Sequence, residues 1–553
     1  MLKENFVTYI TDSIRDNWDY PALSDFRGKD YTYAETGCQI MQLHKLFKEA
    51  GIERGDKISL LGKNSAHWAM VYLATVSYGA VIVPILPDFH PNEIHHIVNH
   101  SDSKLLFVGE MIWDNIDETC MNNLSAIFSL EQFDLLHSYF PSSFEKKMRK
   151  TITACQSNAK GSFSKENFHV EPVSNDEIGI INYTSGTTGF SKGVVLKNTA
   201  LAANVRFARN NLPLKTGERI VSILPLAHTY GCAFEFLWPF SMGCHINFLT
   251  RTPSPKIIVQ AFQTVKPSVV IAVPLIIEKI YKKQIKPTLD KKVMKLLTSL
   301  PIIDQPIYKK INQKLTDVFG GEFREIVIGG APLSSEVETF LRKINFKYAV
   351  GYGMTECGPL ISYVGWEKTK FRSAGKVVDT LEVTIDSDDP EKNVGEILVR
   401  GENVMEGYYK NPEATEMALD KDGWLHTGDL GVVDSDGYVF IKGRNKSLIL
   451  GPSGENIFPE EIEAQINSLP YVMESLVLPH NNNLVALIYP DYEMLDKSHI
   501  SVNQLPQILE EGRKEVNNNL PKYKQISKVK LFPDEFEKTP KKSIKRFLYK
   551  IDE

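Results

Sequence analysis

The sequence has few cysteines, and they are not spaced as in a metal site or a disulfide framework. Only six occur in 553 residues, and no two of them form a C-x-x-C pair. Such wide spacing argues against a structural zinc site and against a small secreted fold held by disulfides. We therefore expect a reducing, cytoplasmic environment. The six are Cys38, Cys120, Cys155, Cys232, Cys244 and Cys357.

Long apolar runs are also absent. The longest, residues 76–86 and 269–277, fall short of the ~20 apolar residues that a membrane-spanning helix needs. The first dozen residues carry acids and lack the unbroken apolar core of a signal peptide. We expect no transmembrane segment, and peripheral contact with the inner face of a membrane stays open. The net charge of −5 gives no indication of a nucleic-acid partner.

What is present is the composition of a large globular protein. Hydrophobic residues make up 42% of the chain and charged residues 24%, and 553 residues exceed one ordinary core. In the first 175 residues, short β-type runs at 57–61, 80–84 and 104–108 alternate with helical patterns. This alternation predicts a parallel, doubly wound sheet. Residues 142–170 are rich in Lys, Ser and Asn and weakly periodic, which indicates a surface excursion.

From about residue 375 the pattern becomes that of β-strands. Residues 395–401 and 431–441 alternate polar and apolar side chains, and Asp436-Gly437 marks a hairpin turn. A new αβ pattern follows Lys446, with a helix that Pro459 can open. We therefore expect one domain at 1–445, with a β-rich part at about 375–445, and a small α+β domain at 446–553.

One stretch has the composition of a phosphate-binding loop. Residues 183–189 read Tyr-Thr-Ser-Gly-Thr-Thr-Gly between apolar runs at 178–181 and 194–196. Glycines let backbone N–H groups converge on an anion, hydroxyls add donors, and Lys192 adds a positive charge. The G-x-x-G-x-x-K spacing is not that of a Walker loop, and no G-K-[ST] occurs in the chain. On loop composition alone, a flexible surface turn explains the cluster equally well.

Two other stretches carry side chains suited to a nucleotide. In the motif at 350–359, Val-Gly-Tyr-Gly-Met-Thr-Glu-Cys-Gly-Pro, Tyr352 could stack on a purine and Thr355 could bind a phosphate oxygen. Glu356 offers the hard oxygen ligand that Mg²⁺ requires, although a single Glu in such a loop is otherwise an exposed turn residue. In Asp-Gly-Trp-Leu-His-Thr-Gly-Asp-Leu at 422–430, the Asp429 carboxylate could accept from both ribose hydroxyls.

These motifs resemble those of the adenylate-forming (ANL) superfamily, which contains acyl-CoA synthetases, firefly luciferases and peptide-synthetase adenylation domains. Residues 183–193 are similar to its phosphate-binding signature, and 422–430 to the fatty-acyl-CoA synthetase signature that continues to Arg444. The resemblance covers nearly the whole chain. It implies an α/β fold, with a large N-terminal domain of doubly wound mixed sheets and a β-rich subdomain, followed by a small mobile α+β domain that pivots at Lys446.

The resemblance also implies the ligands and the residues that hold them. ATP, Mg²⁺ and CoA are the expected cofactors and cosubstrates, and the turn 329–333 contacts adenine in the family. The residues implied to bind them are Thr184, Ser185, Gly186, Thr187, Thr188, Gly189, Lys192, Gly330, Ala331, Pro332, Tyr352, Gly353, Met354, Thr355, Asp429, Arg444, Lys446 and Gly454. The implied catalytic residues are Lys542, His228, Thr187 and Glu356, with Glu356 as the metal ligand.

His228 lies in Pro-Leu-Ala-His-Thr-Tyr-Gly at 225–231. A lone histidine among apolar residues is usually a hydrogen-bonded core residue, but this segment resembles the one that borders the acyl carboxylate in acyl-CoA synthetases. Amino-acid-activating relatives tend to have an aspartate in this region, and no Asp occurs between residues 218 and 250. The absence favours a carboxylate substrate without an ammonium group.

The C-terminal stretch departs from the family pattern. Members usually show Lys-Thr-x-x-Gly-Lys-Ile-x-Arg, whose second lysine binds the carboxylate and α-phosphate. Residues 538–546 here read Lys-Thr-Pro-Lys-Lys-Ser-Ile-Lys-Arg, which places Ser543 at that position. Either the neighbouring Lys542 supplies the ammonium or the first half-reaction proceeds slowly without it, unless the stretch is only a solvated basic tail. We favour Lys542, because its long stem can absorb a small backbone shift.

The sequence therefore predicts an AMP-forming acyl-CoA synthetase for medium-to-long-chain fatty acids. The Lys-rich helical segment 275–325 resembles the insert of long-chain members, although such a charge run is usually a solvated helix face. An aryl- or amino-acid ligase, acyl transfer to a carrier protein, and an inactive nucleotide-binding module are the alternatives. No nucleic-acid partner is expected.

Overall fold

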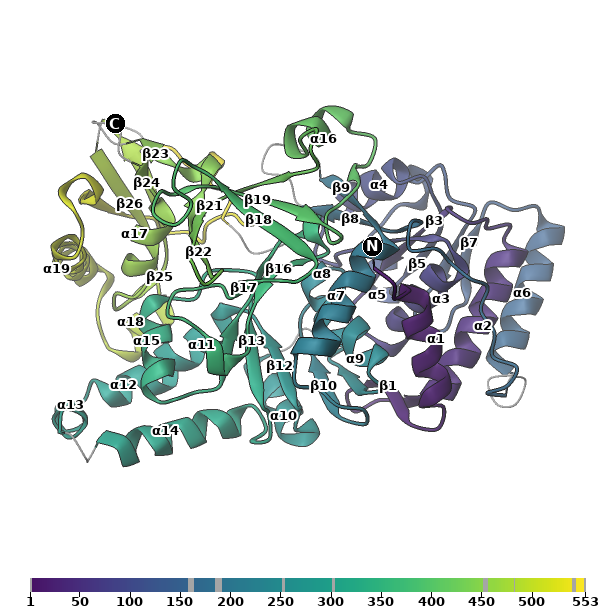
Figure 1. Ribbon diagram of the computed structural model, residues 1–553, viewed down its shortest axis with the longest axis horizontal. Coiled ribbons are helices and arrows are strands. Elements are labelled where there is room, and N and C mark those ends of the chain that lie inside the picture. Colours follow the sequence, from purple (N-terminus) through teal and green to yellow (C-terminus); the bar gives the residue numbers. More distant parts are fainter. Residues whose placement is uncertain are drawn as a thin grey trace.

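The structure is a computed structural model. It describes residues 2–157, 164–184, 191–250, 254–300, 304–450, 456–481, 483–539 and 544–551. Figure 1 shows the N-terminal sheets and helices at one end of the molecule and the elements from β23 onward at the other. Among the described residues, no helix is long and apolar enough to cross a membrane.

The largest sheet has eight strands and is mixed. Its central strands β8, β4, β3, β5 and β6 are parallel, whereas β20, β9 and β7 run antiparallel to their neighbours. The expected doubly wound, mixed α/β fold is thus confirmed. In spatial order the strands are β20 (Gly407–Tyr408), β9 (Lys192–Lys197), β8 (Ile178–Thr184), β4 (Val81–Ile85), β3 (Lys57–Leu61), β5 (Ser103–Val108), β6 (Ala126–Ser129) and β7 (Leu135–Ser138).

Two further sheets accompany the large one. One contains β10 (Arg219–Ser222), β11 (His245–Phe248), β1 (Pro21–Asp25) and β2 (Asp30–Thr32). The other has three parallel strands, β12 (Val269–Ala272), β13 (Glu325–Ile328) and β14 (Tyr348–Val350).

Helix α3 (Ala66–Tyr78) packs between the eight-stranded sheet and the sheet that contains β1. It begins at Ser65, whose side chain accepts from the Trp68 N–H, and ends at Gly79 in the left-handed conformation. All but two of its residues are buried, because it packs against β3, β4 and β1. This accounts for a sequence that is apolar on every side rather than on one stripe.

Of the other helices that precede the β-rich part, some pack on these sheets, whereas the successive helices α12, α13 and α14 pack on one another. These other helices are α1 (Phe6–Asp16), α2 (Tyr33–Glu49), α4 (Pro91–His100), α5 (Glu110–Trp113), α6 (Ser142–Ser157), α7 (Asn198–Asn211), α8 (Thr229–Gly231), α9 (Trp238–Ser241), α10 (Pro255–Val265), α11 (Pro274–Ile280), α12 (Lys286–Leu289), α13 (Lys292–Thr298), α14 (Asp304–Val318) and α15 (Ser335–Lys343). The sequence pattern did not predict α6 as a helix. It lies against α2 and buries Met148 and Ile152.

The β-rich part follows β14. Two antiparallel sheets contain β15 (Tyr352–Gly353), β16 (Leu360–Tyr363) and β17 (Lys376–Val377), and then β18 (Leu381–Asp386), β19 (Gly395–Gly401), β21 (Leu425–Val433) and β22 (Val439–Arg444). Helix α16 (Pro412–Ala418) precedes β21. The turn between β21 and β22 contains Gly437 at φ 81°, which confirms the predicted Asp-Gly hairpin.

The last elements form a separate hydrophobic cluster, whose buried members all lie between residues 457 and 526. They are β23 (Ile449–Leu450), β24 (Asn456–Ile457), α17 (Pro459–Ile466), β25 (Val472–His480), β26 (Asn483–Pro490), α18 (Tyr492–Lys497), α19 (Leu505–Asn518) and β27 (Ile526–Leu531). As predicted, Pro459 stands at the first helical position of α17.

Candidate active site

The predicted phosphate loop connects two strands of the large sheet. Strands β8 and β9 pair antiparallel, with Ile181 opposite Val195 and Thr184 opposite Lys192 at the open end. The flanking apolar runs therefore form the predicted strands, and Thr184 and Lys192 stand where the loop leaves them. Ser185, Gly186, Thr187, Thr188 and Gly189 lie outside the described residues.

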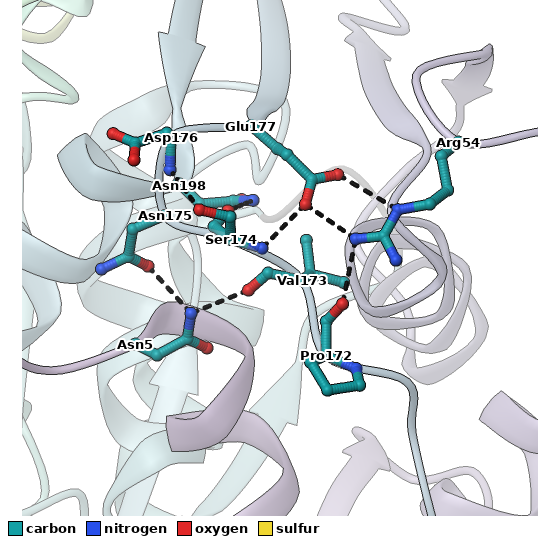
Figure 2. A network of polar contacts seen from close by, with 9 residues as sticks. All are labelled: Asn5, Arg54, Pro172, Val173, Ser174, Asn175, Asp176, Glu177 and Asn198. Atoms are coloured by element: carbon teal, nitrogen blue, oxygen red, sulfur yellow. Dashed lines mark hydrogen bonds and ion pairs between the residues drawn. The ribbon is translucent and has the colours of Figure 1, made fainter.

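A polar network holds the base of this hairpin (Figure 2). Glu177, just before β8, accepts from Arg54 at 2.7 Å and from the Ser174 N–H at 2.8 Å. Asn198, just after β9, donates to the Ser174 carbonyl at 3.2 Å. Asn5 donates to the Val173 carbonyl at 2.8 Å. The residue that caps α1, the turn before β3 and both ends of the hairpin are thus joined by hydrogen bonds.

The other predicted motifs also follow the carboxyl ends of parallel strands, where α/β sheets bind ligands. His228 follows β10, the turn 329–333 follows β13, and Tyr352 follows β14. Hydrogen bonds join them to the hairpin and to one another. Asn182 on β8 donates to the Ala227 carbonyl at 2.9 Å, and the Tyr230 hydroxyl donates to the Val327 carbonyl at 3.2 Å.

Glu356 lies on a single 3₁₀ turn, Thr355–Cys357. Its Oε1 accepts a 2.9 Å hydrogen bond from the Tyr408 hydroxyl, and its carbonyl accepts from the Met405 N–H at 2.9 Å. Gly353 is required just before the turn, because a Cβ there would lie 2.1 Å from the Pro359 carbonyl oxygen. Met354 and Glu356 are half-buried, whereas Thr355 is buried.

Glu356 and its partners form one polar centre of the site, and Asp429 forms a second. Its carboxylate is 5% exposed and accepts from the Tyr352 hydroxyl at 2.7 Å and from Arg444 Nε at 3.0 Å. Asp429 and Arg444 face each other across β21 and β22. Burial raises the pKa of the Asp429 carboxyl, although Arg444 and Tyr352 oppose this effect. The Tyr352 ring is itself almost fully buried beneath this pair.

The His228 loop is fixed by two residues that the sequence patterns did not identify. Glu235, on a π-helix at Cys232–Leu237, accepts through Oε2 from the Ile223 and Leu224 N–H groups at 3.0 and 2.9 Å. Asn64 accepts from the Leu226 N–H at 2.9 Å. Burial raises the pKa of Glu235 to about 8. His228 itself is half-buried at the start of α8.

Residues 330–332 of the turn predicted to contact adenine, and the predicted hinge residue Lys446, are at the surface. Gly330, Ala331 and Pro332 are exposed, and Gly330 adopts φ 83°, a conformation that favours glycine. Lys446 is exposed in a 3₁₀ turn, Asn445–Ser447. Gly454 and Lys542 lie outside the described residues. On either side of residues 540–543, Lys538 pairs with Ile544 in a β-bridge, and Arg546 forms an ion pair with Glu463 at 2.8 Å.

Sequence reasoning also missed Tyr408. It is 52 residues from Glu356, and no periodic pattern or phosphate-type motif marks it. Only the fold of β20 against β9 brings the two side chains together.

The chain is 29% identical over 530 residues to a peroxisomal long-chain acyl-CoA synthetase of Arabidopsis thaliana, covering 87% of this chain and 74% of the relative. It is 27% identical to a 4-coumarate–CoA ligase of Vanilla planifolia, covering 93% and 87%. The fold is similar to that of ATP-bound MatB from Rhodopseudomonas palustris, with a TM-score of 0.75 and 22% identity over 98% and 97% of the two chains.

A family model supplies the assignment. The model described as "AMP-binding enzyme" matches residues 10–409, well over half of the chain. This span contains the β8–β9 hairpin with the predicted phosphate loop, and also His228, the turn 329–333 and Glu356 with its partner Tyr408. We conclude that the chain belongs to the AMP-binding enzyme family.

Proposed function

We propose that the protein is an AMP-forming fatty acid–CoA ligase. A carboxylate oxygen attacks the α-phosphorus of ATP, pyrophosphate leaves, and the sulfur of CoA then attacks the acyl carbonyl and displaces AMP. The observation that carries the proposal is that one fold of this family contains two polar centres, one at Glu356 and one at Asp429. Glu356 and Lys192 both contact Tyr408, which lies on the strand that pairs with β9. Asp429, on β21, accepts from the hydroxyl of Tyr352, which follows β14.

The donor set of the first centre suits Mg²⁺. This ion is usually held by one or two carboxylates together with substrate phosphates and water. Glu356 presents a carboxylate with Oε1 already oriented by Tyr408. Among the described residues, no group of three or more His, Cys, Asp or Glu side chains forms an all-protein metal cage. Bound there, Mg²⁺ would offset negative charge on the phosphates.

In this proposal the chain's own residues perform the remaining tasks. Thr184, Lys192 and the loop 185–189 bind the phosphates, and Thr355 orients an oxygen of the α-phosphate. Asp429 accepts from the ribose hydroxyls, and the glycine turn at 330–332 lies along adenine. His228 borders the carboxylate of the acid. Positive and hydrogen-bonding groups at this point stabilise the charge that develops as two anions react.

The C-terminal residues complete the proposal. We place the domain boundary at Lys446, since the hydrophobic cluster from 457 to 526 is separate from the larger one. Lys542 is proposed to reach the carboxylate in place of the family lysine. Alanine substitutions at Lys541, Lys542 and Lys545 test this role: only Lys542→Ala should lose acyl-AMP formation while still converting supplied acyl-AMP to thioester. Equal behaviour of all three would show that no lysine here has the role.

Medium-to-long-chain fatty acids are the proposed substrates. Long-chain acyl-CoA synthetases of Arabidopsis thaliana and a long-chain-fatty-acid–CoA ligase of Mycobacterium bovis are among the relatives, the latter covering 98% of this chain. Aryl acids are the second candidate, because the 4-coumarate ligase is about as similar. Pyrophosphate release with fatty, aryl and amino acids decides between them. Release with fatty acids alone supports the proposal, and release with other acids alone, or with none, refutes it.

We also propose that the protein contacts an anionic membrane through α13. Residues 274–318 contain ten lysines and four acidic residues in a chain of net charge −5. Val293, Leu296 and Leu300 are 68, 64 and 41% exposed beside these lysines. An apolar surface flanked by lysines suits the headgroup region of an anionic bilayer. Leu296→Glu should reduce sedimentation with phosphatidylserine vesicles, whereas Met111→Glu, at a more exposed site far from these lysines in the sequence, should not. Equal effects, or binding only to an acyl-carrier protein, would contradict this.

A further inference from the structure

We propose that Tyr408 is a positioning residue that orients Glu356 for the metal ion and keeps Glu356 and Lys192 from pairing with each other. The proposal rests on the function given above. It concerns a tyrosine that none of the recognised motifs contains.

Tyr408 belongs to a short segment, residues 405–410, which we call the strap. It includes β20, the strand at one edge of the large sheet. Strand β20 pairs with β9, so that Gly407 faces Val195 and Tyr408 faces Val194. The Tyr409 N–H donates to the Gly193 carbonyl at 2.7 Å. Because Lys192 is the first residue of β9, the strap is hydrogen-bonded directly to the strand that carries Lys192.

The same strap holds Glu356 at two points. The Met405 N–H donates to the Glu356 carbonyl, and the Tyr408 hydroxyl donates to Oε1, both at 2.9 Å. Within the described part of the chain, Glu356 Oε2 accepts no hydrogen bond. One carboxylate oxygen is therefore oriented by the phenol while the other is left for a ligand.

The ring of Tyr408 has a second neighbour. Lys192 Nζ lies 4.8 Å from the ring centroid, within the range of a cation–π contact. Lys192 thus contacts the ring of Tyr408 and Glu356 contacts its hydroxyl, and the two form no ion pair with each other in the described structure. A direct pair would neutralise both groups. Because each group contacts Tyr408 instead, the ammonium stays available for phosphate and the carboxylate for metal.

The two contributions of Tyr408 can be separated by substitution. Tyr408→Phe removes the hydroxyl and keeps the ring over Lys192, whereas Tyr408→Leu removes both. Tyr409→Phe is a matched control, because the adjacent hydroxyl donates to Asp102 at 3.0 Å instead. Lys410 also pairs with Asp102 at 2.7 Å, so the control should leave the strap in place.

The test measures binding of Mn²⁺ by electron paramagnetic resonance in the presence of ATP and without a fatty acid, so it does not depend on turnover. A hydrogen bond to a charged group is strong enough that Tyr408→Phe should weaken Mn²⁺ binding by about tenfold to a hundredfold. Tyr408→Leu should weaken it further, and Tyr409→Phe should bind as the wild type does. The thermal melting temperature reports whether each variant is folded.

The kinetics give an independent readout. In Tyr408→Phe, acyl-AMP formation should require a higher Mg²⁺ concentration for half-saturation but reach nearly the wild-type rate when Mg²⁺ is saturating. Wild-type Mn²⁺ affinity in Tyr408→Phe, or an equal loss in Tyr409→Phe, would overturn the role of the hydroxyl. If no acid is adenylated but the Mn²⁺–ATP difference persists, the proposed reaction fails while the positioning role stands. A wild-type protein that binds no Mn²⁺ with ATP would overturn both.

Discussion

Glu356 is the residue on which the first half-reaction depends in this account. Glu356→Gln keeps the shape of the side chain and can still accept from Tyr408, but it lacks the charge that holds Mg²⁺. We expect acyl-AMP formation to fall by about two to three powers of ten, as for the loss of one electrostatic stabiliser. Glu406→Gln is the control, since Glu406 lies on the same strap but pairs with Lys197 of β9 instead. Near-normal acyl-AMP formation by Glu356→Gln at saturating Mg²⁺ would contradict the role.

Glu235 carries a different residue-scale prediction, because it is fully buried and its Oε1 has no partner among the described residues. Its pKa is about 8 in the folded chain, against an ordinary value of 4.5. Between those values the folded chain holds a proton that the unfolded chain releases. The free energy of unfolding therefore falls as the pH rises from about 4.5 to about 8.

Glu235→Gln is neutral at every pH and can keep the hydrogen bonds to Ile223 and Leu224. We expect it to be more stable than the wild type at pH 8.5, by an amount on the order of a few kcal/mol, and the advantage to disappear by pH 5. Urea unfolding at both pH values measures this. An advantage that does not change with pH would show that the carboxyl is not held neutral by burial.

At the scale of elements, the turn at Lys446 is the predicted pivot of the small domain. Lys446→Pro fixes φ and removes a backbone donor. We expect adenylation to continue while thioester formation from acyl-AMP is lost, because a pivot concentrates its φ/ψ change in a few residues. Lys446→Ala removes the same side chain but keeps the backbone free, so a loss of thioester formation that occurs only in the proline variant is due to the backbone. Equal loss of both half-reactions in the proline variant would disprove the assignment.

Local patterns predicted the elements that carry the motifs. Apolar runs on both sides of residues 183–189 became β8 and β9, and Asp436-Gly437 became the β21–β22 turn. Helix α6 was not predicted, because only scattered residues such as Met148 and Ile152 pack inward. The strap at 405–410 was not predicted either. Its two-residue strand is too short for a periodic signal, and its importance depends on a contact with β9 more than 200 residues away.

At the scale of the whole molecule, the family assignment leaves the acyl chain to be identified. If each added methylene is buried, about 0.8 kcal/mol per CH₂ corresponds to roughly a fourfold gain. We expect kcat/KM to rise by about this factor per carbon from hexanoate upward until the acyl site is full. A flat or falling profile over this range would instead favour short or aryl acids.

The stoichiometry of the complete reaction measures whether the protein is an AMP-forming fatty acid–CoA ligase. The purified protein is given ATP, Mg²⁺, hexadecanoate and CoA, and AMP, pyrophosphate and hexadecanoyl-CoA are quantified together. We expect the three products to form in equal amounts and none to form without the fatty acid. Formation of ADP and phosphate in their place, or AMP formation that does not depend on the fatty acid, would contradict it.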